Sequence, residues 1–332
     1  MTLSPLRRLA SWVALSVAVC GCGSPTPPVP PLPAVADEPP GPVLFEDVTA
    51  ASGVRFTYRN GEEANHYAII ESLGGGVALF DYDGDGRLDV FLPGGGHFNG
   101  TKAVGHPCKL FRNLGGFKFA DVSAAVGLAG PLQYSHGASA FDYDNDGWPD
   151  IFMVNGHVYP DVKSGEYRQR RILYRNGGAG KFTDISAAAG PAVMEKSSAR
   201  GLSVGDYDND GRPDLLITNM NERLSLLRNT LPAGNSITLK LIGQKSNRSA
   251  IGAAVRVTTG NRSLTGEVRS GSTFMSQSDF RLQFGLGIAL KADAVEVQWP
   301  GGALEKLGPI AAGRIVAITE GKGVTANTPY SK

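Results

Sequence analysis

The chain has 332 residues and a formal net charge of +1, with 32 Lys and Arg against 31 Asp and Glu. A balanced charge without a cluster of basic residues argues against a nucleic-acid partner. With 44 Gly and 21 Pro, turns are abundant, and helical periodicity is weak along the whole sequence. We therefore predict an all-β protein.

The N-terminus has the features of an export signal. Two adjacent arginines precede an apolar stretch, Leu9–Val19, which is too short to span a membrane as a helix. The following residues read C-G-C-G-S, and a small residue before a cysteine resembles the bacterial lipobox. We predict a lipoprotein signal peptide over residues 1–21, with lipidation at Cys22. Cys20 is the second candidate, and an ordinary cleaved signal peptide is the alternative.

A proline-rich linker is predicted over residues 22–42. Residues 25–42 contain nine prolines, and such a chain is stiff and extended at about 3.1 Å per residue. It would hold the folded part away from a membrane. If Cys22 is acylated, Cys108 is the last thiol and no disulfide within the chain can form. We expect an exported lipoprotein of the bacterial cell envelope, at the outer membrane or cell surface, or a secreted protein if lipidation does not occur.

An aspartate-rich pattern, D-x-D-x-D-G-x-x-D, occurs three times. Four carboxylates within nine residues repel one another unless a cation lies between them. Oxygen ligands at alternating positions suit a hard cation that takes six to eight oxygens, so we predict about three Ca²⁺ ions. For a single copy, an Asp-Gly hairpin without metal is the alternative. The predicted carboxylate ligands, at positions 1, 3, 5 and 9, are Asp81, Asp83, Asp85 and Asp89, then Asp142, Asp144, Asp146 and Asp150, then Asp206, Asp208, Asp210 and Asp214.

Positions 6, 7 and 12, counted from the first aspartate, show which type of calcium loop the pattern predicts. Glycine at position 6 permits a sharp turn, and position 7 is expected to contribute only its backbone carbonyl, because the residues there differ (Arg87, Trp148 and Arg212). A helix–loop–helix calcium site would have Glu at position 12, where this chain has apolar residues. Each loop is therefore predicted to join two strands.

The copies are separated by 61 and 64 residues, and other segments recur with them, such as L-F-R-N at Leu110–Asn113. Four short apolar runs per repeat are typical of a four-stranded propeller blade. We predict three calcium-binding blades in a short β-propeller over residues 43–232. The runs of the first repeat are Val77–Phe80, Val90–Leu92, Lys109–Arg112 and Lys118–Val122.

Ring closure is the open question of this region. The third repeat lacks its fourth run, and a matching segment lies at Phe45–Val48. We predict that this segment completes the blade that begins at Gly201. Three blades are fewer than the usual four to eight. Either residues 54–76 supply an irregular extra element, or the arc stays open and another surface covers its edges.

After Asn229 the repeat ends, and strands with alternating apolar residues follow at Ser236–Leu241, Ala253–Val257 and Val295–Trp299. This pattern predicts a separate small domain, β-sandwich-like, over residues 233–322. We set residues 323–332 apart as a tail.

At these residues the chain resembles known families. The aspartate repeats, with G-V-A-L-F and G-A-S-A-F before the first two, resemble FG-GAP/VCBS repeats. The C-terminal region resembles the ASPIC/UnbV domain, and Asn155–Pro160 is similar to a segment of the group that includes relatives of cartilage acidic protein. The segments that carry the C-terminal resemblance are Ser246–Ala253, Gln277–Leu282, Phe284–Gly287 and Val295–Gly302.

The resemblance implies a secreted, calcium-binding and non-catalytic protein. We expect a membrane-anchored binding, adhesion or scaffold module whose blade loops contact an extracellular protein or glycan. The alternative is a secreted enzyme of hydrolase or lyase type, or an accessory subunit of one, in which calcium is structural.

The enzyme alternative finds little support in the sequence. There is no H-E-x-x-H motif, and G-x-S-x-G occurs once, at Gly201–Gly205, where the third repeat begins. His97, His106 and Cys108 lie close in sequence and could form a transition-metal site, although loop residues of this kind are more often structural. His157 follows the second loop and could act as a general base, but a structural role is the simpler interpretation.

Overall fold

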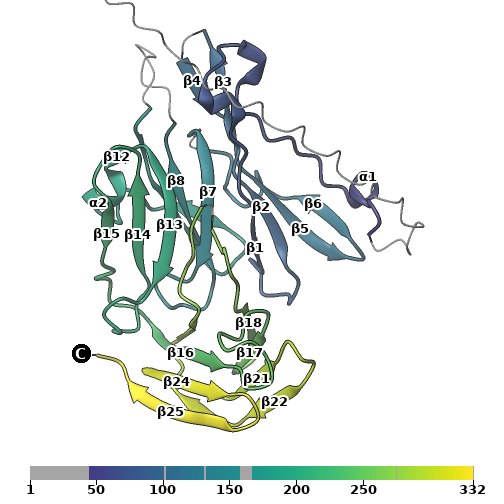
Figure 1. The fold of residues 1–332 in the computed structure, drawn as a ribbon, viewed down its shortest axis with the longest axis vertical. Coiled ribbons are helices and arrows are strands. Elements are labelled where there is room, and N and C mark those ends of the chain that lie inside the picture. The colour runs from purple at the N-terminus through teal and green to yellow at the C-terminus, as the bar shows by residue number, and fades with distance from the viewer. Residues whose placement is uncertain (1–44, 101, 131, 158–166, 274, 332) are drawn as a thin grey trace, which may run out of the picture. The chain divides into compact units, whose positions relative to one another are not determined.

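The computed structural model describes residues 45–331, except for 101, 131, 158–166 and 274 (Figure 1). Residues 47–332 form one compact unit. The predicted signal peptide, Cys22 and the whole of the proline-rich linker, residues 22–42, lie outside the described residues. Among the residues described, no helix combines the length and the apolar character that a membrane crossing requires.

The first repeat forms a four-stranded antiparallel sheet in the order β1-β2-β5-β6. The first aspartate loop joins β1 to β2, which confirms that this loop lies between strands. All four predicted runs contain strands, and buried side chains alternate with less buried ones along β2. The bounds are β1 Ala78–Phe80, β2 Asp89–Leu92, β5 Lys109–Gly115 and β6 Lys118–Asp121.

The second and third repeats follow the same plan. The second sheet has the order β11-β10-β8-β7, and the third has three strands, β13-β14-β15. In both, an aspartate loop again joins the first strand to the second. The bounds are β7 Ser135–Phe141, β8 Asp150–Asn155, β10 Ile172–Asn176, β11 Phe182–Asp184, β13 Ala199–Gly205, β14 Asp214–Asn219 and β15 Ser225–Leu227.

The prediction that Phe45–Val48 completes the third sheet is wrong. These residues form no strand, and they lead into a one-turn helix, α1 (Thr49–Ser52), that lies on the first sheet. The Nζ of Lys118 in β6 donates to the carbonyl oxygen of Ala51 at 2.6 Å. Gly53 has φ +86°, and a Cβ there would lie 2.5 Å from the carbonyl oxygen of Phe119.

The same contact recurs one repeat later, where Ser123–Gly127 is similar in sequence to Thr49–Gly53. Gly127 has φ +92°, and a Cβ there would lie 2.5 Å from the carbonyl oxygen of Phe182, in the outer strand of the second sheet. The amide of Phe182 donates to the carbonyl oxygen of Val126 at 2.7 Å. The repeated segment therefore packs on the outer strand of the sheet that follows it in sequence.

Residues 54–76 form an irregular element, which was one of the two alternatives. It contains the short helices η1 (Glu62–Ala64) and η2 (Ile69–Ser72), and it packs on a hairpin that the sequence did not predict. Ile70, Ala103 and Tyr134 are buried together there. The hairpin strands are β3 Gly96–Asn99 and β4 Lys102–Gly105; a smaller pair is β9 Gln169–Arg170 with β12 Lys196–Ser197, next to α2 Pro191–Met194.

The repeat sheets pack face to face, in a propeller-like arrangement of five small sheets among the described residues. Strand β8 is buried along its whole length. Ile151 and Met153 contact a core shared with the first sheet, whereas Phe152 and Val154 contact a core shared with the third. Because neighbouring side chains of a strand point to opposite faces, β8 joins the two cores.

The C-terminal domain contains two four-stranded sheets, β19-β16-β24-β25 and β18-β17-β21-β22, around one apolar core. The three predicted strands are confirmed as β16, β17 and β21. The bounds are β16 Asn235–Ile242, β17 Ala254–Thr259, β18 Arg262–Glu267, β19 Leu282–Gly287, β20 Lys291–Ala292, β21 Ala294–Gln298, β22 Leu304–Leu307, β23 Ile310–Ala311, β24 Arg314–Thr319 and β25 Gly323–Pro329.

Residues 323–329 are a strand of this domain rather than part of a tail. Strand β25 pairs antiparallel with β24, from Thr319 opposite Gly323 to Arg314 opposite Pro329. The six residues Val324–Pro329 are exposed, so the segment lacks the apolar alternation by which a strand is identified from sequence. Backbone pairing holds it on the sheet.

Trp299 gives a test of this core. Its ring is 1% exposed, and its Nε1 donates to Oε2 of Glu305 at 3.0 Å. Trp299→Ala should lower the free energy of unfolding of the C-terminal domain by about 3–5 kcal/mol, because it leaves a large cavity. Urea unfolding followed by circular dichroism would measure the loss. Ile288→Ala, at a side chain that is 98% exposed, is the control and should change stability by less than about 0.5 kcal/mol.

Candidate metal centres

We call Asp81–Asp89 loop 1, Asp142–Asp150 loop 2 and Asp206–Asp214 loop 3. In each loop, the carboxylate at position 1 organises the backbone. Oδ1 of Asp81 accepts the amides of Gly84 and Asp85 at 2.8 and 3.1 Å, and its Oδ2 accepts the amide of Gly86 at 2.7 Å. Position-1 carboxylates accept the amides of positions 5 and 6 in loops 2 and 3 as well.

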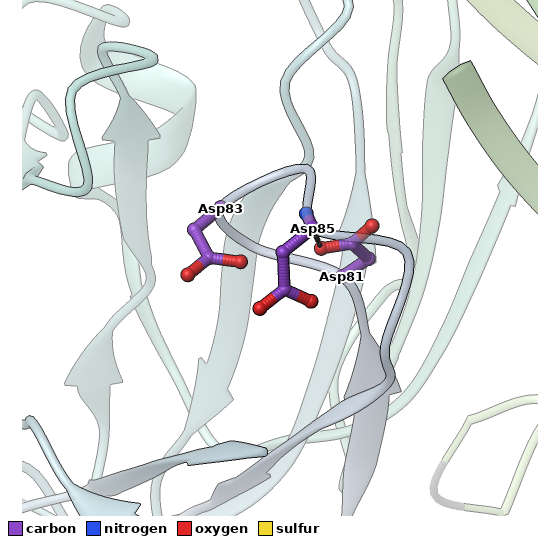
Figure 2. Close-up of side chains that lie close together, drawn as sticks. All are labelled: Asp81, Asp83 and Asp85. Carbon is purple, nitrogen blue, oxygen red and sulfur yellow. Dashed lines mark hydrogen bonds between the residues drawn. The ribbon is translucent and has the colours of Figure 1, made fainter. Parts of the chain in front are cut away.

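Glycine at position 6 has positive φ in all three loops, between +82° and +88°, as the pattern predicted. In loop 1, the side chains of Asp81, Asp83 and Asp85 lie close together (Figure 2). In every loop, one oxygen from each of the carboxylates at positions 1, 3 and 5 lies within 4.8 Å of the others. The three clusters are Asp81, Asp83 and Asp85; Asp142, Asp144 and Asp146; and Asp206, Asp208 and Asp210.

The carboxylate at position 9 connects the loop to the third strand of its sheet. Asp89 is fully buried. Its Oδ2 accepts the amide of Tyr82 at 3.0 Å, and its Oδ1 accepts the amide of Asn113 at 2.8 Å. Asp150 and Asp214 make the equivalent bonds. Position 9 therefore fixes the loop, and its service as a metal ligand stays a prediction.

The pKa values of several of these carboxyl groups are raised. Burial, followed by repulsion from the other carboxylates of loop 2, raises the pKa of Asp142 to about 8. Burial raises the pKa of Asp150 to about 9 and that of Asp89 to about 6, each against the effect of two backbone N–H donors. A bound cation would remove this cost by favouring the ionised form. The donor set, oxygen only and crowded with like charge, thus fits a calcium ion.

The sequence analysis missed an arginine in each site. Nε of Arg112 lies 2.6 Å from Oδ2 of Asp83, and its Nη2 lies 3.3 Å from Oδ2 of Asp85. Arg175 and Arg228 make the corresponding ion pairs at positions 3 and 5 of loops 2 and 3. The sequence contains a pattern that could have identified these arginines, because each occupies the same position of the repeated L-x-R-N segment. They add positive charge on one side of each carboxylate cluster.

The asparagine after this arginine connects neighbouring repeats. Nδ2 of Asn176 donates to the carbonyl oxygen of Tyr82 in loop 1 at 2.9 Å. Nδ2 of Asn229 donates to the carbonyl oxygen of Tyr143 in loop 2 at 2.7 Å. Each such bond runs from one sheet to the aspartate loop of the preceding sheet, so the loops also lie between the sheets that they help to hold together.

The side chains at position 7, for which the sequence predicted no role, make ionic or cation–π contacts. Those of Arg87 and Arg212 contact the carboxylates of Asp85 and Asp210 in their own loops. The ring of Trp148 lies 4.4 Å from the guanidinium carbon of Arg262, a cation–π distance. The role of the position-7 carbonyls as ligands stays a prediction.

The other candidate residues do not form a shared site among the described residues. The rings of His97 and His106 lie 4.7 Å apart, but Cys108 is buried in an apolar core, with its Sγ 3.9 Å from Sδ of Met153. Burial raises the pKa of Cys108 to about 12. His157 is fully buried, and burial lowers its pKa to about 4, which makes it a weak base.

Comparison with known protein families gives two matches. The model for the FG-GAP-like repeat matches residues 81–153 and 154–217, which include the three aspartate loops. The model for ASPIC and UnbV matches residues 243–325, which include most of the two C-terminal sheets.

Comparison with individual proteins finds similarity to cartilage acidic protein 1. Human cartilage acidic protein 1 is 26% identical over 286 residues, which is 83% of this chain and 38% of that protein. The mouse protein is 26% identical over 270 residues. The chain thus spans well under half the length of these relatives. The crystal structure of the V. cholerae biofilm matrix protein Bap1 matches 76% of this chain and 41% of that chain at 13% identity, but its TM-score of 0.25 is too low to inform the fold. The chain carries FG-GAP-like repeats followed by an ASPIC and UnbV domain, the domain architecture of its homologue cartilage acidic protein 1.

Proposed function

We propose that this protein is a non-catalytic, exported scaffold or adhesion module that requires calcium for its rigidity. One observation carries the proposal: the same carboxylate cluster is assembled three times, each time at the turn between the first two strands of a repeat sheet. The ligands in each loop would be the carboxylates at positions 1, 3, 5 and 9 and the carbonyl at position 7. Extracellular calcium modules of this kind bind with Kd values of about 10⁻⁴–10⁻³ M.

Calcium would act here as a cross-link. Each loop holds its first and second strands through positions 1 and 9, and it reaches the third strand through the amide at Asn113 or its equivalents. An ion that neutralises the loop therefore stabilises three strands at once. Because Cys108 is a buried free thiol, no disulfide of that residue contributes to this stability.

The architecture that we propose is a short propeller of three blades, followed by a sandwich of the two C-terminal sheets. The domain limits are residues 43–232 for the repeats and 233–322 for the ASPIC and UnbV domain, extended by β25. An irregular element, residues 54–76, packs beside the repeat sheets. Its burial against β3 and β4 supports a role in covering one edge of the arc.

The partner that we propose is an extracellular protein or a glycan, contacted by loops at the blade ends, with the chain tethered to a membrane through a lipid on Cys22. Calcium-dependent binding of the lipid-free protein to a glycan array and to immobilised extracellular proteins would test this. Binding that is the same in calcium and in EDTA would contradict a role for the loops.

Removal of calcium should destabilise the protein. In EDTA, the clustered carboxylates repel one another, and several must be protonated or remain uncompensated. We expect the melting temperature to fall by at least about 6 °C relative to 5 mM calcium, since calcium at about 5 to 50 times its Kd contributes about 1–2 kcal/mol at each of three sites. Differential scanning calorimetry in both buffers measures the shift, and an unchanged melt would refute structural calcium.

A single carboxylate at position 3 should control one ion. Asp144 pairs with Arg175, and its Oδ1 also accepts the amide of Asp146 at 3.4 Å. Asp144→Asn removes the charge of this ligand and leaves an amide oxygen that can still accept that backbone amide. We expect isothermal titration calorimetry to show one ion fewer than the three of the parent chain. Asp293→Asn, at an exposed carboxylate next to Lys291, should leave the stoichiometry unchanged. Loss of all binding in Asp144→Asn would indicate unfolding rather than loss of one site.

A further inference from the structure

Loops 2 and 3 differ from loop 1 at position 4, although the rest of the pattern is shared. Loop 1 has Gly84 there, whereas loops 2 and 3 have Asn145 and Asn209. All three residues have positive φ: +74°, +57° and +59°. Glycine adopts this conformation at the lowest cost and asparagine is the usual substitute, so the backbone alone gives no reason for asparagine at two of the three places.

The side chain of Asn145 makes contacts that a glycine could not make. Its Oδ1 accepts Nε2 of Gln283 in the C-terminal domain at 2.9 Å. Its Nδ2 donates to the carbonyl oxygen of Gly211 in loop 3 at 2.8 Å. The backbone carbonyl oxygen of Asn145, which a glycine would also supply, accepts the amide of Gly287 at 2.9 Å. Asn145 is 1% exposed, so these bonds are made away from water.

Loop 2 is held by the C-terminal domain at several other atoms. Nη1 of Arg262 donates to the carbonyl oxygen of Asp146 at 2.8 Å, and its Nη2 donates to that of Gly147. The amide of Gly234 donates to the carbonyl oxygen of Asp144 at 2.8 Å. A Cβ at Gly285 would collide with Oδ2 of Asp142. The domain thus touches the metal-binding loop at its ligand residues.

Asn209 has the same role in loop 3. Its Oδ1 accepts Nη1 of Arg281 at 2.6 Å, and its carbonyl oxygen accepts the amide of Ser331 at 2.7 Å. Nη2 of Arg281 donates to the carbonyl oxygen of Asp206 at 2.8 Å. Nε2 of Gln283 donates to that of Gly211 at 2.7 Å, which brings one glutamine to both loops.

Loop 1 lacks such contacts: none of the hydrogen bonds found within the described residues joins it to residues 233–331. Strand β13 also bonds to the C-terminal domain, through residues 202–204. We propose that loops 2 and 3 form the metal-binding part of the docking surface for the C-terminal domain, and that Asn145 and Asn209 are the positioning residues that couple calcium binding in these loops to docking. Calcium fixes the loop shape that presents the two amides, and docking in turn holds that shape. Linkage requires that the coupling be reciprocal. The inference rests on the proposed calcium sites, and it adds that the three sites fall into two classes.

The test converts both loops to the loop 1 sequence. Asn145→Gly with Asn209→Gly keeps a residue that tolerates positive φ but removes the amides. In the full chain without its signal peptide, calcium titration by calorimetry should show two of the three sites weakened roughly tenfold, a coupling of the usual size, with the third unchanged. Scanning calorimetry in saturating calcium should show the C-terminal domain melting separately, whereas the parent chain melts in one transition.

Two further variants distinguish the outcomes. Asn221→Gly makes the same change at an exposed asparagine with φ +54° and should alter neither readout. Arg281→Met removes the donor to loop 3 alone and should weaken one site. If all three sites of the double glycine variant kept the affinities of the parent chain, or if all three weakened together, the coupling would be overturned. A parent chain that binds no calcium would overturn the proposed sites themselves, a result seen before any variant is made.

Discussion

The repulsion among carboxylates is the constraint on which this structure depends. Each loop brings three carboxylate oxygens within 4.8 Å of one another and buries a fourth carboxylate beneath them. Backbone amides, an arginine from the third strand and, as we propose, a calcium ion offset this repulsion. Because the loop lies between the first two strands of a sheet, whatever compensates its charge also decides how firmly those strands are joined.

The loops also order the sheets relative to one another. An asparagine at the end of the third strand donates to the loop of the preceding repeat. Position 9 therefore joins every loop to its own sheet, and a carbonyl oxygen joins loops 1 and 2 to the next sheet as well. Strand β8, apolar on both faces, provides the matching contact in the core. Polar contacts at the loops and apolar contacts along β8 therefore favour the same face-to-face packing.

Local signals in the sequence were sufficient for much of this fold. The strands beside each loop and the alternating strands of the C-terminal domain follow from residue type and spacing. The segment Phe45–Val48 was recognised as matching the repeats but was assigned to the wrong sheet, because similarity between segments does not say which neighbour they contact. Strand β25 is exposed and held by backbone pairing, so it lacks the apolar alternation by which strands are predicted. The hairpin β3–β4 lies outside the four runs that recur with each aspartate loop, so the repeat pattern did not predict it.

The candidate metal sites, like the fold, could be predicted from the sequence only in part. Positions 1, 3 and 5 converge as the spacing required, but the pattern alone could not assign Arg112 and its equivalents, whose role depends on strand pairing. Position 4 is the more instructive case, because D-Y-D-G-D-G and D-Y-D-N-D-G are equivalent as calcium loops. Their difference becomes meaningful only when the C-terminal domain is in place, with Gln283 against Asn145 and Arg281 against Asn209. Where copies of a repeat share every residue that their common chemistry needs, the residue that departs from the pattern indicates what each copy does alone.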